Sequence, residues 1–172
     1  MRLLFCIDKK DYGGCTHILT RDSARSIIIR DGKVAMIHSR KYDYYKFPGG
    51  SIEQGENPVE AMIRETREEA GLTVVPYTVK EYGYVHRIQK SSKDPTECFI
   101  QDNYYFLCDV MDSPASQDLD EYEADESYHL VFVHPEPAII KNRNVKGCPY
   151  DQLMLEREAR VLERLICEGL IH

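Results

Sequence analysis

Three glutamates on one predicted helix are the residues of this chain best placed to do chemistry. Glu65, Glu68 and Glu69 lie three and four positions apart, so on a helix they share one face. Carboxylates this close repel each other unless positive charge lies among them, and hard divalent cations such as Mg²⁺ prefer such oxygen ligands. A bound cation would stabilise charge that develops on a phosphate oxygen. The cluster therefore points to a metal site suited to cleaving a phosphoanhydride bond.

The helix that must position these glutamates has recognisable ends. Asn57 suits the N-cap, Pro58 suits the first turn, and Glu60 completes a capping box with Asn57. Gly71 suits the position just past the last turn. The pattern predicts a helix over 58–70.

A structural interpretation competes with the metal site. Glutamate-rich helix faces are usually solvated and paired with basic residues, and Arg64 is four residues from both Glu60 and Glu68. The glycine-rich turn before the helix favours the metal site, because the backbone at Gly50 can approach a metal or a phosphate closely.

The motif as a whole resembles the Nudix box. Gly50 is followed by five residues, Glu56, seven more residues, and then the run Arg-Glu-Thr-Arg-Glu-Glu-Ala-Gly-Leu over 64–72. The single departure is Thr66, where an aliphatic residue is usual; threonine is isosteric with valine, so we expect the packing to survive. Phe-Pro-Gly-Gly over 47–50 resembles the strand that leads into the box.

The resemblance implies an α+β fold, the Nudix α/β/α sandwich with a mixed β-sheet between helices. It implies hydrolysis of a nucleoside diphosphate linked to another moiety, a small-molecule nucleotide-type substrate. By family likeness the ligands of Mg²⁺ or Mn²⁺ would be Glu65, Glu68, Glu69 and the carbonyl of Gly50.

The remaining roles in the box are also assigned by resemblance. Arg64 would pair with Glu56 or Glu68 and orient the cluster, and Glu56 would be mainly structural. Glu68 is a candidate general base, although a loop acid such as Glu123 or Glu126 could serve instead.

The rest of the chain predicts a single domain over 1–172. It comprises an N-terminal strand and loop (1–23), the Nudix box (50–72) and a C-terminal amphipathic helix (151–168). Two β-branched runs joined by Asp31-Gly32 predict a hairpin. Other predicted segments are strands at 3–7, 26–30, 34–38 and 44–47, extended chain at 72–75, 77–88 and 99–110, an acidic solvated loop at 112–126, a strand at 128–134 and a short helix from 135.

Substrate contacts outside the box are only weakly indicated. Arg40, Lys46 and Phe47 precede the glycine turn and could stack on a base or meet a phosphate. A core or solvated role for each of them stays open.

Composition narrows the class of protein. The net charge of −7 argues against general affinity for nucleic acid. No apolar run approaches the roughly 18–20 residues of a membrane helix. The apolar run at the start ends at Asp8 and is too short for the core of an export signal. The six cysteines match no zinc pattern, so we expect a cytoplasmic protein whose thiols are free and buried. A homodimer stays open.

Two other functions fit the same resemblance. A catalytically silent Nudix domain could sense a nucleotide metabolite, but it would not need the full set Glu65, Glu68 and Glu69. The isomerase branch that shares the fold needs a catalytic cysteine, which the sequence does not place.

Overall fold

Two β-sheets form the centre of the fold in the computed structural model, which describes residues 1–112, 116–149 and 152–172. The larger sheet has the order β1-β8-β9-β3-β7, with β2 also paired to β9. The smaller sheet has the order β10-β5-β4, with β6 also paired to β5. The strands are β1 (Leu3–Asp8), β2 (His17–Thr20), β3 (Ser23–Ile27), β4 (Ile29–Arg30), β5 (Lys33–Ser39), β6 (Tyr44–Lys46), β7 (Gly49–Ser51), β8 (Lys80–Lys90), β9 (Glu97–Leu107) and β10 (Tyr128–Val133).

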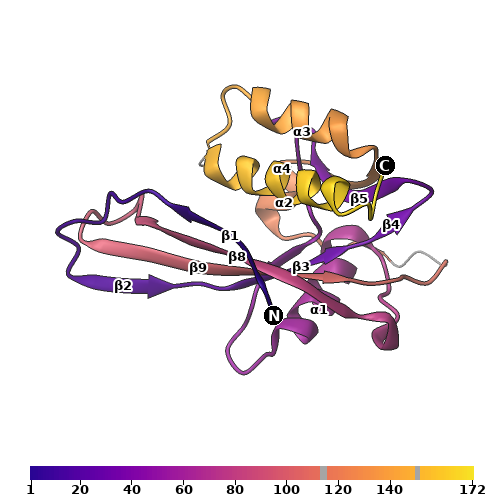
Figure 1. Cartoon of the computed structure of the whole chain (residues 1–172), viewed down its shortest axis with the longest axis horizontal. Helices are drawn as coiled ribbons and strands as arrows, with labels where there is room; N and C mark the ends of the chain where they lie inside the picture. The colour runs from indigo at the N-terminus through magenta and orange to yellow at the C-terminus, as the bar shows by residue number, and fades with distance from the viewer. Residues whose placement is uncertain (113–115, 150–151) are drawn as a thin grey trace.

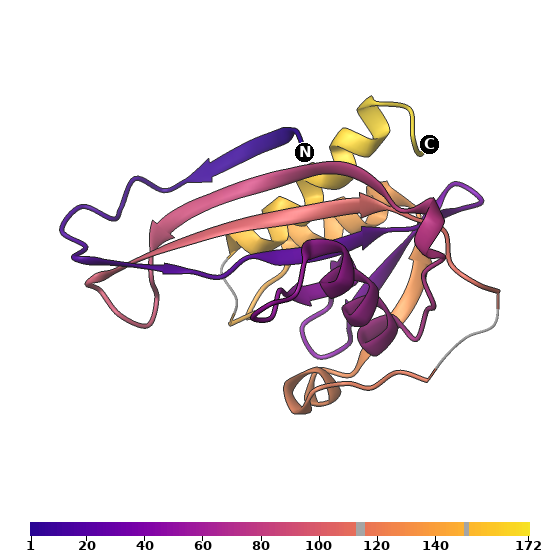
Figure 2. The ribbon, with the colours of Figure 1, turned by 90° about the horizontal axis from the view of Figure 1, so that it is seen from below.

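Helices cover the sheets from both sides. The helices are α1 (Pro58–Ala70), α2 (Glu121–Asp125), α3 (Pro135–Asn144) and α4 (Gln152–Cys167), with a 3₁₀ turn at Pro76–Thr78. Figures 1 and 2 show α3 and α4 on one side of the larger sheet and α1 on the other. This arrangement confirms the α+β sandwich with a mixed sheet between helices, because the larger sheet has both parallel and antiparallel pairs. The smaller sheet is a second one, and its described pairs are all antiparallel. No helix in the described ranges is long and apolar enough to cross a membrane.

The box helix has the predicted bounds. The Asn57 side chain accepts hydrogen bonds from the backbone N–H groups of Val59 and Glu60, and the Glu60 side chain accepts one from the Asn57 N–H. Gly71 closes the helix in the left-handed conformation, with φ of 63°. Both ends therefore follow from the local sequence, as capping predicts.

The predicted first hairpin is present but its first strand is split. β4 pairs with β5 around Asp31-Gly32, as predicted. However, the expected strand 26–30 is interrupted at Ile28, because β3 belongs to the larger sheet and β4 to the smaller one. Ile28 is 1% exposed, so the crossing point lies in the core.

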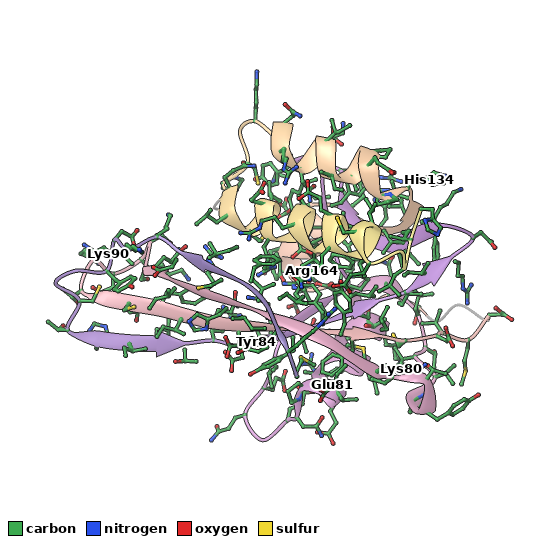
Figure 3. The ribbon with its side chains drawn as sticks, in the orientation of Figure 1. Lys80, Glu81, Tyr84, Lys90, His134 and Arg164 are labelled. Carbon is green, nitrogen blue, oxygen red and sulfur yellow. The ribbon has the colours of Figure 1, made fainter. Side chains whose placement is uncertain are left out.

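A long arm of the larger sheet was only partly predicted. β8 and β9 are each 11 residues long and pair antiparallel, and Lys80 and Lys90 mark the two ends of β8 in Figure 3. The prediction that 9–23 is entirely loop is wrong, because β2 lies within it and pairs parallel with β9. All residues of β2 are exposed, so no buried face produced a sequence signal.

The C-terminal half differs from prediction in length more than in type. The helix expected from 135 is 10 residues long, and the last helix runs from Gln152 to Cys167, with residue 151 outside the described residues. The acidic stretch 112–126 is not wholly loop, because α2 occupies its end. α4 buries its apolar stripe, including Leu155, Leu162 and Leu165, against the sheet side.

Candidate active site

Helix α1 is fixed against the sheet by its buried face. Ala61, Met62 and Thr66 are fully buried, and α1 contacts β3 and β7. The hydroxyl of Thr66 donates to Ser26 Oγ at 2.9 Å. The one departure from the box therefore forms a hydrogen bond in the core, while Glu65 and Glu68 lie on the half-buried side of α1.

Arg64 ties the acidic residues together. Its Nε and Nη2 donate to the two carboxylate oxygens of Glu56, each at 2.9 Å. Its Nη1 donates to Glu65 at 2.9 Å and to Glu68 at 3.0 Å, and Nη2 also reaches the Ser51 carbonyl at 3.1 Å. Arg64 was predicted to pair with Glu56 or Glu68, and it pairs with both. This fork geometry fixes the orientation of three carboxylates at once.

Glu65 packs directly against the glycine turn. A Cβ atom added to Gly50 would lie 2.4 Å from Glu65 Oε2, so any other residue at position 50 would displace this carboxylate. Burial raises the pKa of Glu65, and the hydrogen bond from Arg64 opposes that rise. The turn and the helix therefore bring a backbone segment and a carboxylate into van der Waals contact.

Glu69 points inward instead of toward solvent. It is 1% exposed, forms an ion pair with Lys46, and accepts the Gly49 N–H at 2.9 Å. Its backbone carbonyl accepts the side-chain amide of Gln117 at 2.5 Å. Glu69 thus links α1 to the turn that precedes the box.

Two acids of the predicted solvated loop are buried. Glu123 is 4% exposed and accepts the Asp120 N–H and the Tyr122 hydroxyl, each at 2.9 Å. Burial, followed by its interaction with Glu69, raises the pKa of Glu123 to about 7. Glu126 is 3% exposed and accepts the hydroxyls of Ser39 and Tyr44. The prediction of a solvated loop is wrong for these two residues.

The carboxylates have the donor chemistry for a hard divalent cation. Within 1–112, 116–149 and 152–172, no three Asp, Glu, His or Cys side chains are arranged as a metal-binding group. Arg64 forms ion pairs with Glu65 and Glu68, and Lys46 forms an ion pair with Glu69. The residues nevertheless fit a divalent cation, because their side-chain ligand atoms are carboxylate oxygens. Gly50 also has no Cβ, so the Glu65 carboxylate can lie close to the backbone there.

The three predicted substrate residues have different surroundings. Lys46 pairs with Glu69 and lines a cavity together with Gly50 and Glu65. Its ammonium lies 4.8 Å from the Tyr128 ring centroid. Phe47 is fully buried and packs edge-on against Tyr105, so its side chain belongs to the core. Arg40 is exposed and is not among the described residues that line the pocket.

One cavity of about 720 Å³ is lined by Gly50, Arg64, Glu65 and Glu68 of the box and extends beyond them. This volume is in the usual range for small-molecule sites. Sequence reasoning missed many residues of its lining. They come from β3 and the residues just before it, from β8, β9 and α4, and from α2 and the loop before it. They include Arg21, Ser23, Arg25, Arg87, Phe99, Gln101, Arg157, Asp118 and Tyr122. The alternation of Arg87 with Gln89 and of Phe99 with Gln101 on adjacent strands was the available signal.

A buried charge network forms part of the cavity wall through Arg25 and Arg157. Glu158 is fully buried and accepts the Phe47 N–H at 2.8 Å. Arg157 donates to Glu158 from Nε and Nη2, at 2.9 and 2.6 Å, and to Asn103 at 2.5 Å. Arg25 donates to the carbonyls of Phe47 and Gly49 at 3.0 and 3.1 Å. The segment before the box is therefore held by side chains from β3, α1 and α4.

Comparison with known proteins identifies the family. The NUDIX domain model matches residues 20–161, so the chain belongs to the Nudix family. An RNA pyrophosphohydrolase of Xylella fastidiosa (strain Temecula1) is 31% identical over 115 residues, which cover 62% of this chain and 60% of that protein. An RNA pyrophosphohydrolase of Acinetobacter baylyi is 29% identical over 138 residues, covering 73% of this chain and 80% of that protein.

Solved structures share the fold. A NUDIX hydrolase from Nitrosomonas europaea superposes with a TM-score of 0.61 at 16% identity, covering 90% of this chain and 93% of the other. A MutT structure, from work on Aliivibrio salmonicida and Vibrio cholerae, gives a TM-score of 0.54 at 18% identity, covering 87% and 99%. The chain spans less than two thirds of the length of the Xylella relative that it matches.

Proposed function

We propose that this protein hydrolyses a pyrophosphate bond in a nucleotide-type substrate, with Mg²⁺ or Mn²⁺ held by Glu65, Glu68, Glu69 and the Gly50 carbonyl. One observation carries the proposal. Arg64 holds Glu65 and Glu68 side by side on a single nitrogen, in a cavity that also contains Gly50. The names of the curated relatives, RNA pyrophosphohydrolase, agree with this chemistry.

The side chains divide the work. The cation, when bound, would neutralise the diphosphate and stabilise the leaving oxygen. Arg64 orients the carboxylates through its contacts with Glu56, Glu65 and Glu68. Glu68 is the proposed base, because its side chain is 37% exposed and can reach a water in the cavity. Glu123 lines the same cavity and is the second candidate for this role.

Two other functions receive less support. The isomerase branch needs a catalytic cysteine, and none of the six cysteines is among the described residues that line the cavity. A nucleotide sensor would not need Glu65 and Glu68 oriented together by Arg64. We also propose a cytoplasmic location, which agrees with six cysteines that form no disulfide in the described residues. The thiols of Cys98 and Cys108 are buried as predicted, but the prediction is wrong for Cys6 and Cys167, which are exposed.

The test is a substrate screen with a matched variant pair. Purified protein is incubated with nucleoside di- and triphosphates, sugar nucleotides, dinucleotides and RNA with a 5′-triphosphate, with Mg²⁺ or Mn²⁺. We expect phosphate or pyrophosphate release from at least one substrate, and a loss of roughly 10²–10⁴-fold in Glu68→Gln. Glu136→Gln makes the same chemical change at an exposed position of α3 and should retain full activity.

The outcomes separate the hypotheses. If activity survives in Glu68→Gln and falls in Glu123→Gln, the general base is Glu123 and not Glu68. Activity that survives in both variants contradicts the mechanism. Inactivity of the unaltered protein on the whole panel overturns the hydrolase in favour of the sensor.

A further inference from the structure

A patch on the β8–β9 hairpin forms part of the cavity away from the box glutamates. Arg87 and Gln89 of β8 lie directly opposite Gln101 and Phe99 of β9 in the antiparallel register. Residues opposite each other in such a pair share a face, and so do residues two apart on one strand. The four side chains therefore form one surface, which we call the hairpin platform. Arg87, Phe99 and Gln101 line the cavity.

The platform combines a ring with fixed polar groups. Phe99 is half-buried, and the Arg87 guanidinium carbon lies 5.7 Å from its ring centroid. Arg87 is 8% exposed, and its Nε and Nη2 donate to Gln89 Oε1 at 3.0 and 2.8 Å. These bonds hold the guanidinium in place beside the ring, so the platform is formed before any ligand binds.

The chemistry of the platform matches a planar, polar-edged ring system. Nucleobases bind to proteins by stacking on aromatic side chains and on Arg guanidinium planes, with hydrogen bonds to their edges. Phe99 and Arg87 supply the stacking groups, and the Gln101 amide offers both a donor and an acceptor on the same face. A bare phosphate would use the guanidinium but would gain nothing from the ring.

The platform is joined to the box side of the cavity by rigid structure. Next to Gln101 on the same face of β9, Asn103 accepts hydrogen bonds from Ser23 and Arg157. Arg157 in turn holds Glu158, which fixes the segment before the box. The distance between the platform and the carboxylates is therefore set by buried contacts.

We propose that the hairpin platform binds the nucleobase of the substrate, with Phe99, Arg87 and Gln101 as specificity residues. The proposal rests on the proposed function for the opposite end of the cavity, where the phosphates would bind. It assigns the base to β8 and β9 and the diphosphate to the α1 side of one cavity.

The test measures binding without catalysis. Isothermal titration calorimetry with AMP, GMP, CMP and UMP is done in EDTA, and ribose 5-phosphate is the ligand without a base. We expect the unaltered protein to bind at least one nucleotide about tenfold more tightly than ribose 5-phosphate. Phe99→Ala should lose about that factor for the nucleotide and leave the sugar phosphate unchanged.

Phe5→Ala is the matched control. Phe5 is also half-buried and also contacts an arginine, with the Arg160 guanidinium carbon 3.9 Å from its ring centroid, but it lines a different surface pocket. It should bind nucleotides as the unaltered protein does. Gln101→Leu should change the preference among the four bases, which a purely structural residue would not do.

Several results would overturn the proposal. They are equal binding of nucleotide and ribose 5-phosphate, unchanged nucleotide binding in Phe99→Ala, or no nucleotide binding at all. If the substrate screen shows hydrolysis but these results occur, only the platform is refuted. If nucleotides bind through Phe99 but no substrate is cleaved, the platform stands and the hydrolase is refuted.

Discussion

Two buried glutamates from opposite helices hold the same short segment of chain, yet their surroundings differ. Glu158 of α4 accepts the N–H of Phe47, and Glu69 of α1 accepts the N–H of Gly49. Glu158 lies among the cations Arg157 and Arg25. Glu69 has Lys46 as its cation but interacts with a second carboxylate, Glu123. Both glutamates therefore make the same kind of backbone contact, but cations surround Glu158, whereas Glu69 has one cation and a second carboxylate as neighbours.

The difference teaches which glutamate can take part in chemistry. Burial alone would raise the pKa of Glu158, but the charges of Arg157 and Arg25 outweigh it and the pKa lies below its ordinary value. Such a carboxylate stays ionised and fully engaged. Around Glu69, burial and the neighbouring carboxylate disfavour the charged form of Glu123 and raise its pKa to about 7, so an additional cation there would stabilise both carboxylates. The first site is structural and the second is the proposed metal site.

Removing the charge of Glu158 should give the largest change in stability. Glu158→Gln leaves Arg157 and Arg25 buried with less negative charge, and breaking such a buried pair costs about 3–5 kcal/mol. Urea unfolding measures the loss. Glu156 lies on α4 like Glu158, but its ion pair with Arg143 of α3 is exposed. Glu156→Gln should therefore cost less than about 1 kcal/mol. Equal costs in the two variants would contradict the comparison.

The pH dependence gives an independent check on the same residue. A carboxylate with a lowered folded-state pKa stabilises the fold above the ordinary glutamate pKa, and that contribution is lost as pH falls through the folded-state value. The gap in unfolding free energy between the unaltered protein and Glu158→Gln should be constant above about pH 5.5 and narrow below about pH 4. A gap that widens in acid would mean that the sign is wrong.

Glu69→Gln should affect activity more than stability. We expect kcat to fall by about 100-fold or more, because a proposed metal ligand is weakened. Mg²⁺ should raise the melting temperature of the unaltered protein, as a ligand of the folded state does, but not that of Glu69→Gln. In Glu158→Gln this Mg²⁺-dependent rise should persist. A variant at Glu69 that keeps both kcat and the Mg²⁺ effect would make Glu69 a structural residue like Glu158.

Thr66 should give the smallest effect, since it supports the helix without touching either glutamate. Thr66→Val removes the hydrogen bond to Ser26 while preserving shape. We expect a loss of about 1 kcal/mol, or roughly 2–4 °C in melting temperature, with kcat unchanged. Thermal unfolding followed by circular dichroism measures it. A change in kcat would show that the position of α1 depends on this bond.

The candidate site was predictable where its signals are local in the chain. Helix α1, its cap at Asn57 and its end at Gly71 follow from short-range hydrogen bonding, and the structure has the same bounds. The spacing within the box places Glu65 and Glu68 on one face, where Arg64 binds both. The assignment of Phe47 to the substrate rested on sequence proximity alone, and the structure buries its ring in the core.

Residues far apart in the chain needed the tertiary structure. Arg87 and Phe99 lie on different strands, and only the β8–β9 register brings them to one face beside the cavity. Glu123 belongs to an acidic stretch that composition alone predicts to be solvated, and it is buried because α2 turns it toward Glu69. The sequence by itself determined the bounds of α1 and the spacing of its glutamates, since caps and i, i+4 contacts are local. Only the tertiary structure decided which glutamates are neutralised and what lines the rest of the cavity, since long-range packing sets both.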